Sequence, residues 1–132
     1  PWFGGGTTRT NEYADDTPPE GIIHPAVETT AHCADLGMAF YTGNQFPEKY
    51  KNAIFSAQHG SWNRTEPCGA RVMVTFIDQD GNATMEPFAE GWLNANKEYD
   101  GRPMSIEPMK DGSILVSDDY AGAIYKISYV GG

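Results

Sequence analysis

Apolar residues in this chain come in short runs and not at the spacing of an amphipathic helix. The runs are rich in β-branched and aromatic residues and are each long enough for one strand. They fall at 36–41, 53–58, 71–77, 84–88, 102–107, 113–117 and 123–129. No segment shows a sustained helical period. The pattern predicts an all-β fold.

Turn residues divide these runs into two sets. The segment 78–82 contains Asp-Gly-Asn-type turn chemistry, and Lys110-Asp-Gly supplies a tight turn in the second set. The two sets repeat loosely, which predicts about two antiparallel blades of a β-propeller, one over 36–90 and a last, three-stranded blade over 101–129. We expect the missing fourth strand of the second blade to come from sequence outside this chain.

The first 35 residues differ from the rest, because they are rich in Gly, Thr, Pro and acidic residues. They predict a loop-rich excursion and not a linker to a second domain. The chain begins at Pro1 and not at Met. We therefore expect a processed, truncated or cleaved part of a longer protein.

Charge narrows the set of partners. The chain of 132 residues has 18 acidic and 9 basic residues, a formal net charge of −9. This argues against binding nucleic acid or anionic lipid. No apolar stretch approaches the roughly 18 residues of a membrane span, so we predict no transmembrane segment.

The two cysteines, Cys33 and Cys68, lie in loop-like segments. They lack the Cys-x-x-Cys spacing of a zinc framework, and the sequence leaves open whether they are bridged or free. We predict the bridge, which would indicate an oxidising compartment.

The densest candidate chemistry follows the apolar run 53–57, where His59, Trp62, Asn63 and Arg64 lie within six residues. Guanidinium and imidazole groups can bind carboxylates, and an indole can stack on a flat ring. Arg64 could equally pair with a nearby acid, and Trp62 could pack between blades. Arg102 lies between Gly101 and Pro103, where it is either a ligand contact or an exposed loop residue.

Four ordered motifs carry a resemblance to a known family. They are GMAFYTGNQFP at 37–47, AQHGSWNR at 57–64, GRP at 101–103 and DGSILVSDDYAGAIYKISY at 111–129. Together they resemble the C-terminal part of the glucose/sorbosone dehydrogenase family, most closely its sorbosone dehydrogenase branch. The resemblance implies a six-bladed propeller that binds pyrroloquinoline quinone (PQQ) and calcium and oxidises an aldose or related sugar, a periplasmic or secreted quinoprotein oxidoreductase that passes electrons to an acceptor.

The resemblance also implies roles for individual residues. His59, Arg64 and Arg102 would contact the cofactor at one mouth of a shared cavity, and His32, Asp35 and Trp62 would border the sugar pocket. At the position of His59 the aldose dehydrogenases of the family usually have lysine, so the chain departs from the pattern there. The general-base histidine and the calcium ligands belong to earlier blades. We therefore assign no catalytic residue to this chain and expect it to be inactive alone.

Other interpretations remain. His32, Cys33 and Asp35, together with His24 and His59, have no recognised metal-ligand spacing, so we predict no metal site there. Asp118 and Asp119 could bind a cation, but successive side chains of a strand point to opposite faces, which favours a turn or salt-bridge role. The alternative to an enzyme is a catalytically inert propeller that acts as a binding or scaffold module.

Overall fold

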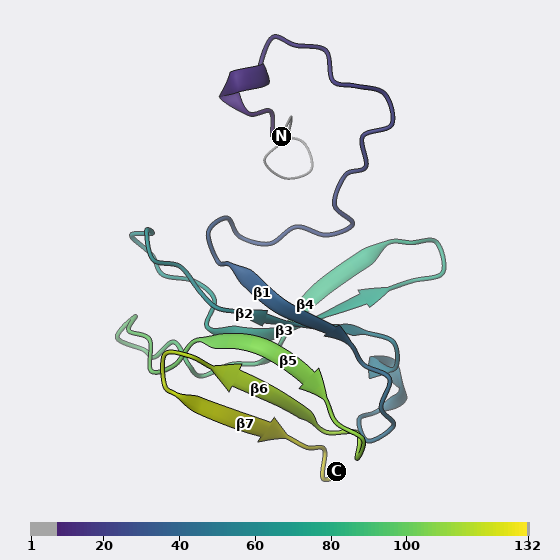
Figure 1. Cartoon of the computed structure of the whole chain (residues 1–132), viewed down its shortest axis with the longest axis vertical. Coiled ribbons are helices and arrows are strands. Elements are labelled where there is room, and N and C mark those ends of the chain that lie inside the picture. The colour runs from purple at the N-terminus through teal and green to yellow at the C-terminus, as the bar shows by residue number, and fades with distance from the viewer. Residues whose placement is uncertain (1–7, 132) are drawn as a thin grey trace.

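The computed structural model describes residues 8–131, and in it two antiparallel sheets pack face to face (Figure 1). The four-stranded sheet has the order β1-β2-β3-β4 and the three-stranded sheet the order β5-β6-β7. The strands are β1 Asp35–Phe40, β2 Ile54–Gln58, β3 Arg71–Ile77, β4 Ala83–Ala89, β5 Pro103–Pro108, β6 Ile114–Asp118 and β7 Ala123–Ile127. The described chain adds only two single-turn 3₁₀ helices, η1 Asn11–Tyr13 and η2 Glu48–Tyr50.

The prediction of an all-β fold with two antiparallel blades is confirmed, since each sheet is a meander of sequential strands. Strand ends differ slightly from the prediction. β5 begins one residue late because the backbone N–H of Arg102 donates to the carboxylate of Asp118 instead of a neighbouring strand. β7 ends at Ile127, and the backbone N–H of Tyr129 donates to the side chain of Gln45.

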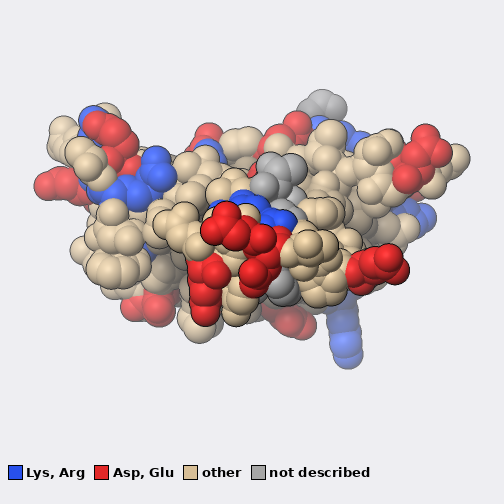
Figure 2. All heavy atoms as spheres, turned by 90° about the horizontal axis from the view of Figure 1, so that it is seen from above, with Lys and Arg blue, Asp and Glu red and all other residues tan. Residues whose placement is uncertain are grey.

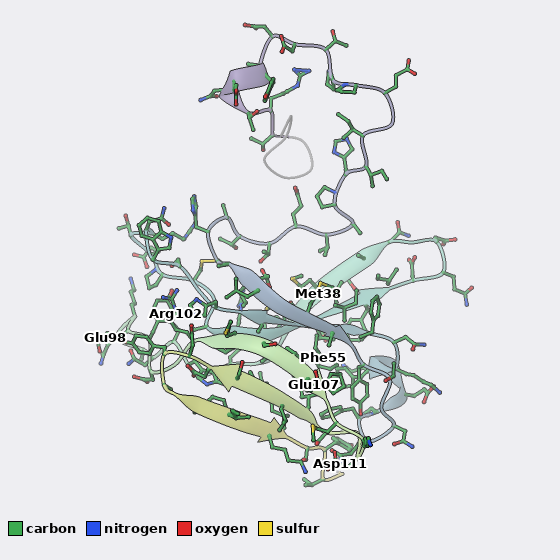
Figure 3. All side chains as sticks on the ribbon, in the orientation of Figure 1. Met38, Phe55, Glu98, Arg102, Glu107 and Asp111 are labelled. Carbon is green, nitrogen blue, oxygen red and sulfur yellow. A yellow bond between two sulfur atoms is a disulfide. The ribbon has the colours of Figure 1, made fainter. Side chains whose placement is uncertain are left out.

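The hydrophobic core lies between the two sheets. Phe55 is enclosed there (Figure 3), together with Val74 from β3 and Ile114 and Val116 from β6. Burying each such side chain contributes about 1.5–3 kcal/mol. Tyr41 closes one end of the core, because its buried hydroxyl donates to the carbonyl of Gly112 at 2.6 Å and so joins the sheets.

The first strands of the two sheets lie side by side. A Cβ on Gly37 in β1 would lie 2.6 Å from the Cα of Ser105 in β5, so only glycine allows this approach. Contact between first strands is the arrangement of neighbouring propeller blades, whose inner strands converge on the central channel.

The opposite face of the four-stranded sheet is apolar and largely open. Met38 and Phe40 are 60% and 57% exposed, and in Figure 3 Met38 points away from the second sheet. A groove of about 340 Å³ follows this face and is bordered by the excursion at Val27 and Thr29. The residues described include no helix with the length and apolar character needed to span a membrane.

Aspartates build both predicted turns. Asp78 accepts hydrogen bonds from the backbone N–H groups of Asp80 and Asn82 at 2.9 and 2.8 Å. Asp111 accepts one from the N–H of Ser113 at 3.0 Å and pairs with Lys126 at 2.7 Å. The ammonium of Lys126, followed by the Ser113 hydrogen bonds, lowers the pKa of Asp111 below its ordinary value.

Candidate functional site

The candidate residues lie at one end of the two sheets, where β2 and β6 end and β5 begins. Figure 3 shows Arg102 at this end and Asp111 at the other. Loops 59–70 and 90–102 meet here with the β6–β7 turn. This convergence follows from the meander topology, because every second connection of an antiparallel sheet falls at the same end.

Arg102 clamps the second blade to the loop after β2. Its Nε donates to the carbonyl of His59 at 3.0 Å, and its Nη2 donates to the carbonyls of Gly60 and Ser61 at 2.8 and 3.2 Å. Its guanidinium carbon lies 4.8 Å from the centre of the Tyr99 ring. The Nη1 group has no hydrogen-bond partner among residues 8–131. Arg102 is therefore a structural clamp with one open nitrogen.

His59 is fixed at three points. Its backbone N–H donates to the carbonyl of Ala34 at 2.8 Å, and its own carbonyl accepts from Arg102. Its ring Nε2 lies 2.9 Å from Oδ1 of Asp119. The hydrogen bond from His59 lowers the pKa of Asp119, which is therefore ionised at neutral pH. The predicted neighbours His59 and Arg102 are thus in contact, and the carboxylate of Asp119 holds the His59 ring.

The prediction of a turn or salt-bridge role for the Asp118–Asp119 pair is confirmed in its first form, the turn. Asp118 is 3% exposed and accepts hydrogen bonds from the backbone N–H groups of Arg102 and Ala121, whereas Asp119 pairs with His59. A Cβ on Gly101 would lie 2.2 Å from the Asp118 carboxylate. Gly101 therefore lets the chain pass Asp118 closely enough to place Arg102.

A disulfide holds the site loop to the excursion. Cys33 and Cys68 are bonded, with 5.4 Å between their Cα atoms, as predicted. Arg64 adds a second tie, because its Nη1 donates to the carbonyl of Ala31 at 3.0 Å and its Nε to the carbonyl of Glu66 at 3.0 Å. Arg64 and Arg102 thus belong to the same end of the sheets but bind different backbone segments.

The predicted sugar-pocket residues are spread over this end. Trp62 is 86% exposed at the tip of loop 59–70 and does not pack between the two described blades. His32 is exposed, with a left-handed φ of 68°. Asp35 accepts hydrogen bonds from Ser56 at 3.1 Å and Gln58 at 3.0 Å and borders the apolar groove of β1–β4. The structure thus ties Asp35 into the sheet.

The buried Gln58, directly before His59, organises a polar network across the four-stranded sheet. Its amide donates to Asp35 and Thr29, and its carbonyl accepts from Nε of Arg71 at 2.8 Å. Arg71 also forms an ion pair with Glu90, with 3.1 Å between Nη1 and Oε1. Arg71 and Glu90 both line a pocket of about 280 Å³ beside Cys68. All acceptors and donors of Gln58 are satisfied, so this network is a rigid base for the site loop.

The surface has no large area of one charge in the view from above. Figure 2 shows acidic groups at the centre, left and right of that face, with basic groups among them. Within residues 8–131, no three His, Cys, Asp or Glu side chains form a group that could hold a metal ion.

Comparison with known proteins identifies the family. The family model described as TrAA12-like matches residues 2–130. The chain belongs to the TrAA12-like family. This TrAA12-like chain is 36% identical over 132 residues to a Borreliella burgdorferi protein described only as uncharacterized, covering 98% of the chain and 35% of that protein. It is 26% identical over 155 residues to the PQQ-dependent pyranose dehydrogenase of Coprinopsis cinerea, covering 99% of the chain and 20% of that enzyme.

Solved structures agree with this assignment. The holo form of the PQQ domain of Coprinopsis cinerea pyranose dehydrogenase superposes with a TM-score of 0.57 at 25% identity, over 74% of this chain and 27% of that domain. The calcium structure of a Trichoderma reesei protein of carbohydrate-active enzyme family AA12 has a TM-score of 0.59 at 18% identity, over 81% and 27%, and supports the fold. The TrAA12-like chain thus spans about a third or less of its relatives' length.

Sequence reasoning missed three residues of the site: Gln58, Tyr99 and Asp119 as the partner of His59. Tyr99 donates to the carbonyl of Cys68 at 2.9 Å and accepts from the N–H of Ser61 at 3.0 Å. The sequence signal that could have pointed to Tyr99 was its position three residues before Arg102. The pairing of Asp119 with a residue of the other blade has no counterpart in local sequence.

Proposed function

We propose that this chain is the C-terminal portion of a six-bladed propeller that oxidises an aldose or related carbonyl sugar with PQQ as hydride acceptor. The family assignment and the relation to a PQQ-dependent pyranose dehydrogenase support the class of enzyme. The observation that carries the role of this chain is the open Nη1 of Arg102 beside the His59–Asp119 pair.

The donor chemistry of this end fits an anionic quinone. PQQ has three carboxylates, and a guanidinium nitrogen with two free N–H groups is a strong carboxylate donor. In this proposal Arg102 and His59 bind the cofactor, Arg64 adds positive charge, and the exposed Trp62 with His32 and Asp35 borders the sugar. The chain's own contribution is orientation and electrostatics.

The remaining features belong to the whole protein. We place the calcium ligands and the general base in the upstream blades, and we retain the sorbosone dehydrogenase branch as the substrate class. The disulfide is consistent with an oxidising compartment, which supports a periplasmic or secreted enzyme that passes electrons to a separate acceptor.

The test uses the full-length parent, reconstituted with PQQ and calcium and assayed with aldoses, sorbosone and an artificial acceptor. We expect turnover by the parent and none by residues 1–132 alone. Arg102→Ala should weaken quinone binding by about 1.5–3 kcal/mol through loss of a charged hydrogen bond. Lys110→Ala is the matched control, since Lys110 is exposed at the opposite end of the sheets. Unchanged quinone affinity in Arg102→Ala would remove Arg102 from the site.

A non-catalytic propeller is the second candidate. The exposed apolar side chains of Met38 and Phe40 are the one observation that favours this candidate, because they form a surface on which another protein segment can pack. A redox titration of the parent with PQQ and calcium separates the candidates, because a scaffold would show neither quinone uptake nor sugar-dependent reduction.

A further inference from the structure

We propose that Asp119 is a positioning residue that fixes the ring of His59 so that Nδ1 alone faces a bound ligand. This inference rests on the proposed role of His59 in cofactor binding. Asp119 lies in the β6–β7 turn, on the other blade from His59, and its Oδ1 is 2.9 Å from Nε2. The ring is therefore held by a group outside its own blade.

The backbone of His59 cannot adjust independently. Its N–H is bonded to Ala34 at 2.8 Å and its carbonyl to Nε of Arg102 at 3.0 Å. The remaining freedom is rotation about the side-chain bonds, and the contact with Asp119 removes it. Only 19% of the His59 side chain is exposed, compared with 54% for Asp119.

The chemistry of the pair selects one form of the ring. An ionised carboxylate only accepts hydrogen bonds, and the contact with His59 keeps Asp119 ionised by lowering its pKa. Nε2 therefore carries the proton. Nδ1 has no hydrogen-bond partner among the described residues, so it is the ring nitrogen left for a ligand. A ring held through one nitrogen by a carboxylate presents the other in a defined direction.

Arg102 makes the arrangement specific to this end of the molecule. It binds the backbone of residue 59, and its charge also lowers the pKa of Asp119. The open Nη1 of Arg102 and the Nδ1 of His59 are thus two polar groups placed by one cluster. Nη1 of Arg102 donates hydrogen bonds, whereas the unprotonated Nδ1 of His59 accepts them. The shared ligand therefore has a carboxylate or carbonyl oxygen beside an N–H or O–H group.

The test is NMR of the full-length parent labelled with ¹⁵N at histidine, with the His59 signals assigned from a His59→Gln variant. Wild type should show the Nε2–H form of the neutral ring. Asp119→Ala should give a mixture of the two neutral forms, whereas Asp119→Asn should retain Nε2–H, because the amide oxygen still accepts. Tyr120→Ala is the control, since Tyr120 is an exposed neighbour in the same turn.

PQQ affinity is the second measurement. Asp119→Ala should bind PQQ about tenfold more weakly, the effect of one displaced hydrogen bond, with Asp119→Asn close to wild type and unfolding midpoints unchanged. An unaltered ring form in Asp119→Ala, or an altered form with unaltered PQQ affinity, would overturn the proposal. If wild type binds no PQQ, the proposed function fails, and the NMR result still decides whether Asp119 orients the ring.

Discussion

The guanidinium of Arg102 in one blade donates through Nε to the carbonyl oxygen of His59 in the other, at 3.0 Å. Two further carbonyls, of Gly60 and Ser61, accept from the same side chain. The arginine thus binds the turn after β2 at three successive positions. A cation that binds backbone so fully is part of the fold as well as a candidate for ligand contact.

Replacing Arg102 should destabilise the protein even without ligand. Arg102→Ala leaves three carbonyls without their donor, and we expect a loss of about 2–3 kcal/mol in the free energy of unfolding. Arg102→Lys should recover only part of it, because an ammonium lacks the planar fork. Urea denaturation of the parent and both variants measures the difference. Stability equal to wild type in Arg102→Ala would show that the clamp is weak.

Loss of the disulfide should also lower stability. The bridge joins cysteines 35 positions apart, and closing a loop of that length stabilises by about 4 kcal/mol in the chain-entropy model. We expect the Cys33→Ser/Cys68→Ser double variant to unfold at lower denaturant concentration than wild type. Reductant should shift wild type toward the variant and leave the variant unchanged. Coincident curves for all samples would contradict the prediction.

Removing the buried hydroxyl of Tyr41, at the end of the sheets opposite the candidate site, should lower the free energy of unfolding strongly. The Tyr41 hydroxyl donates to Gly112 and accepts from the N–H groups of Gln45 and Phe46. Tyr41→Phe leaves these groups unsatisfied, and we expect destabilisation of about 2–4 kcal/mol. Tyr120→Phe, at a tyrosine that is 64% exposed, should change stability by less than about 0.5 kcal/mol. Similar values for the two variants would refute the inter-sheet role of Tyr41.

The contribution of Asp111 to the free energy of unfolding should depend on pH. Lys126 and Ser113 lower its pKa in the folded state, so its contribution is present above the ordinary carboxyl range and disappears as pH falls toward the folded-state value. Asp111→Asn should therefore destabilise the protein more at pH 7 than near pH 2. Denaturation curves at several pH values test this. A difference that grows on acidification would have the wrong sign.

The strands were predictable because each one places apolar side chains in the core between the two sheets, and these side chains appear in the sequence as a short apolar run. β2 shows the limit of this logic: it is central in its sheet, so Phe55, Ser56, Ala57 and Gln58 are all buried and no alternation remains. The disulfide was predictable as one of two alternatives. The loose repeat of the two strand sets predicted their arrangement as blades, and the resemblance supplied what periodicity could not, namely the family and its cofactor.

The contacts of the site were less predictable than its residues. His59 and Arg102 were identified as candidates, but the sequence did not indicate that the Arg102 guanidinium also binds backbone carbonyls over 40 positions away. Such hydrogen bonds depend on how two blades are docked, and a one-dimensional pattern does not encode that geometry. The pairing of Asp119 with His59 was missed for the same reason.

The loop that carries Trp62 is tied to residues 31–34 at its beginning, middle and end, by His59, Arg64 and Cys68. Ordering a flexible loop on binding opposes affinity, and a loop already fixed avoids that entropy loss. A sugar or quinone that contacts Trp62 would therefore meet a preorganised surface. Substitutions at its exposed tip could change ligand preference while the anchoring residues and the register of the blades stay the same.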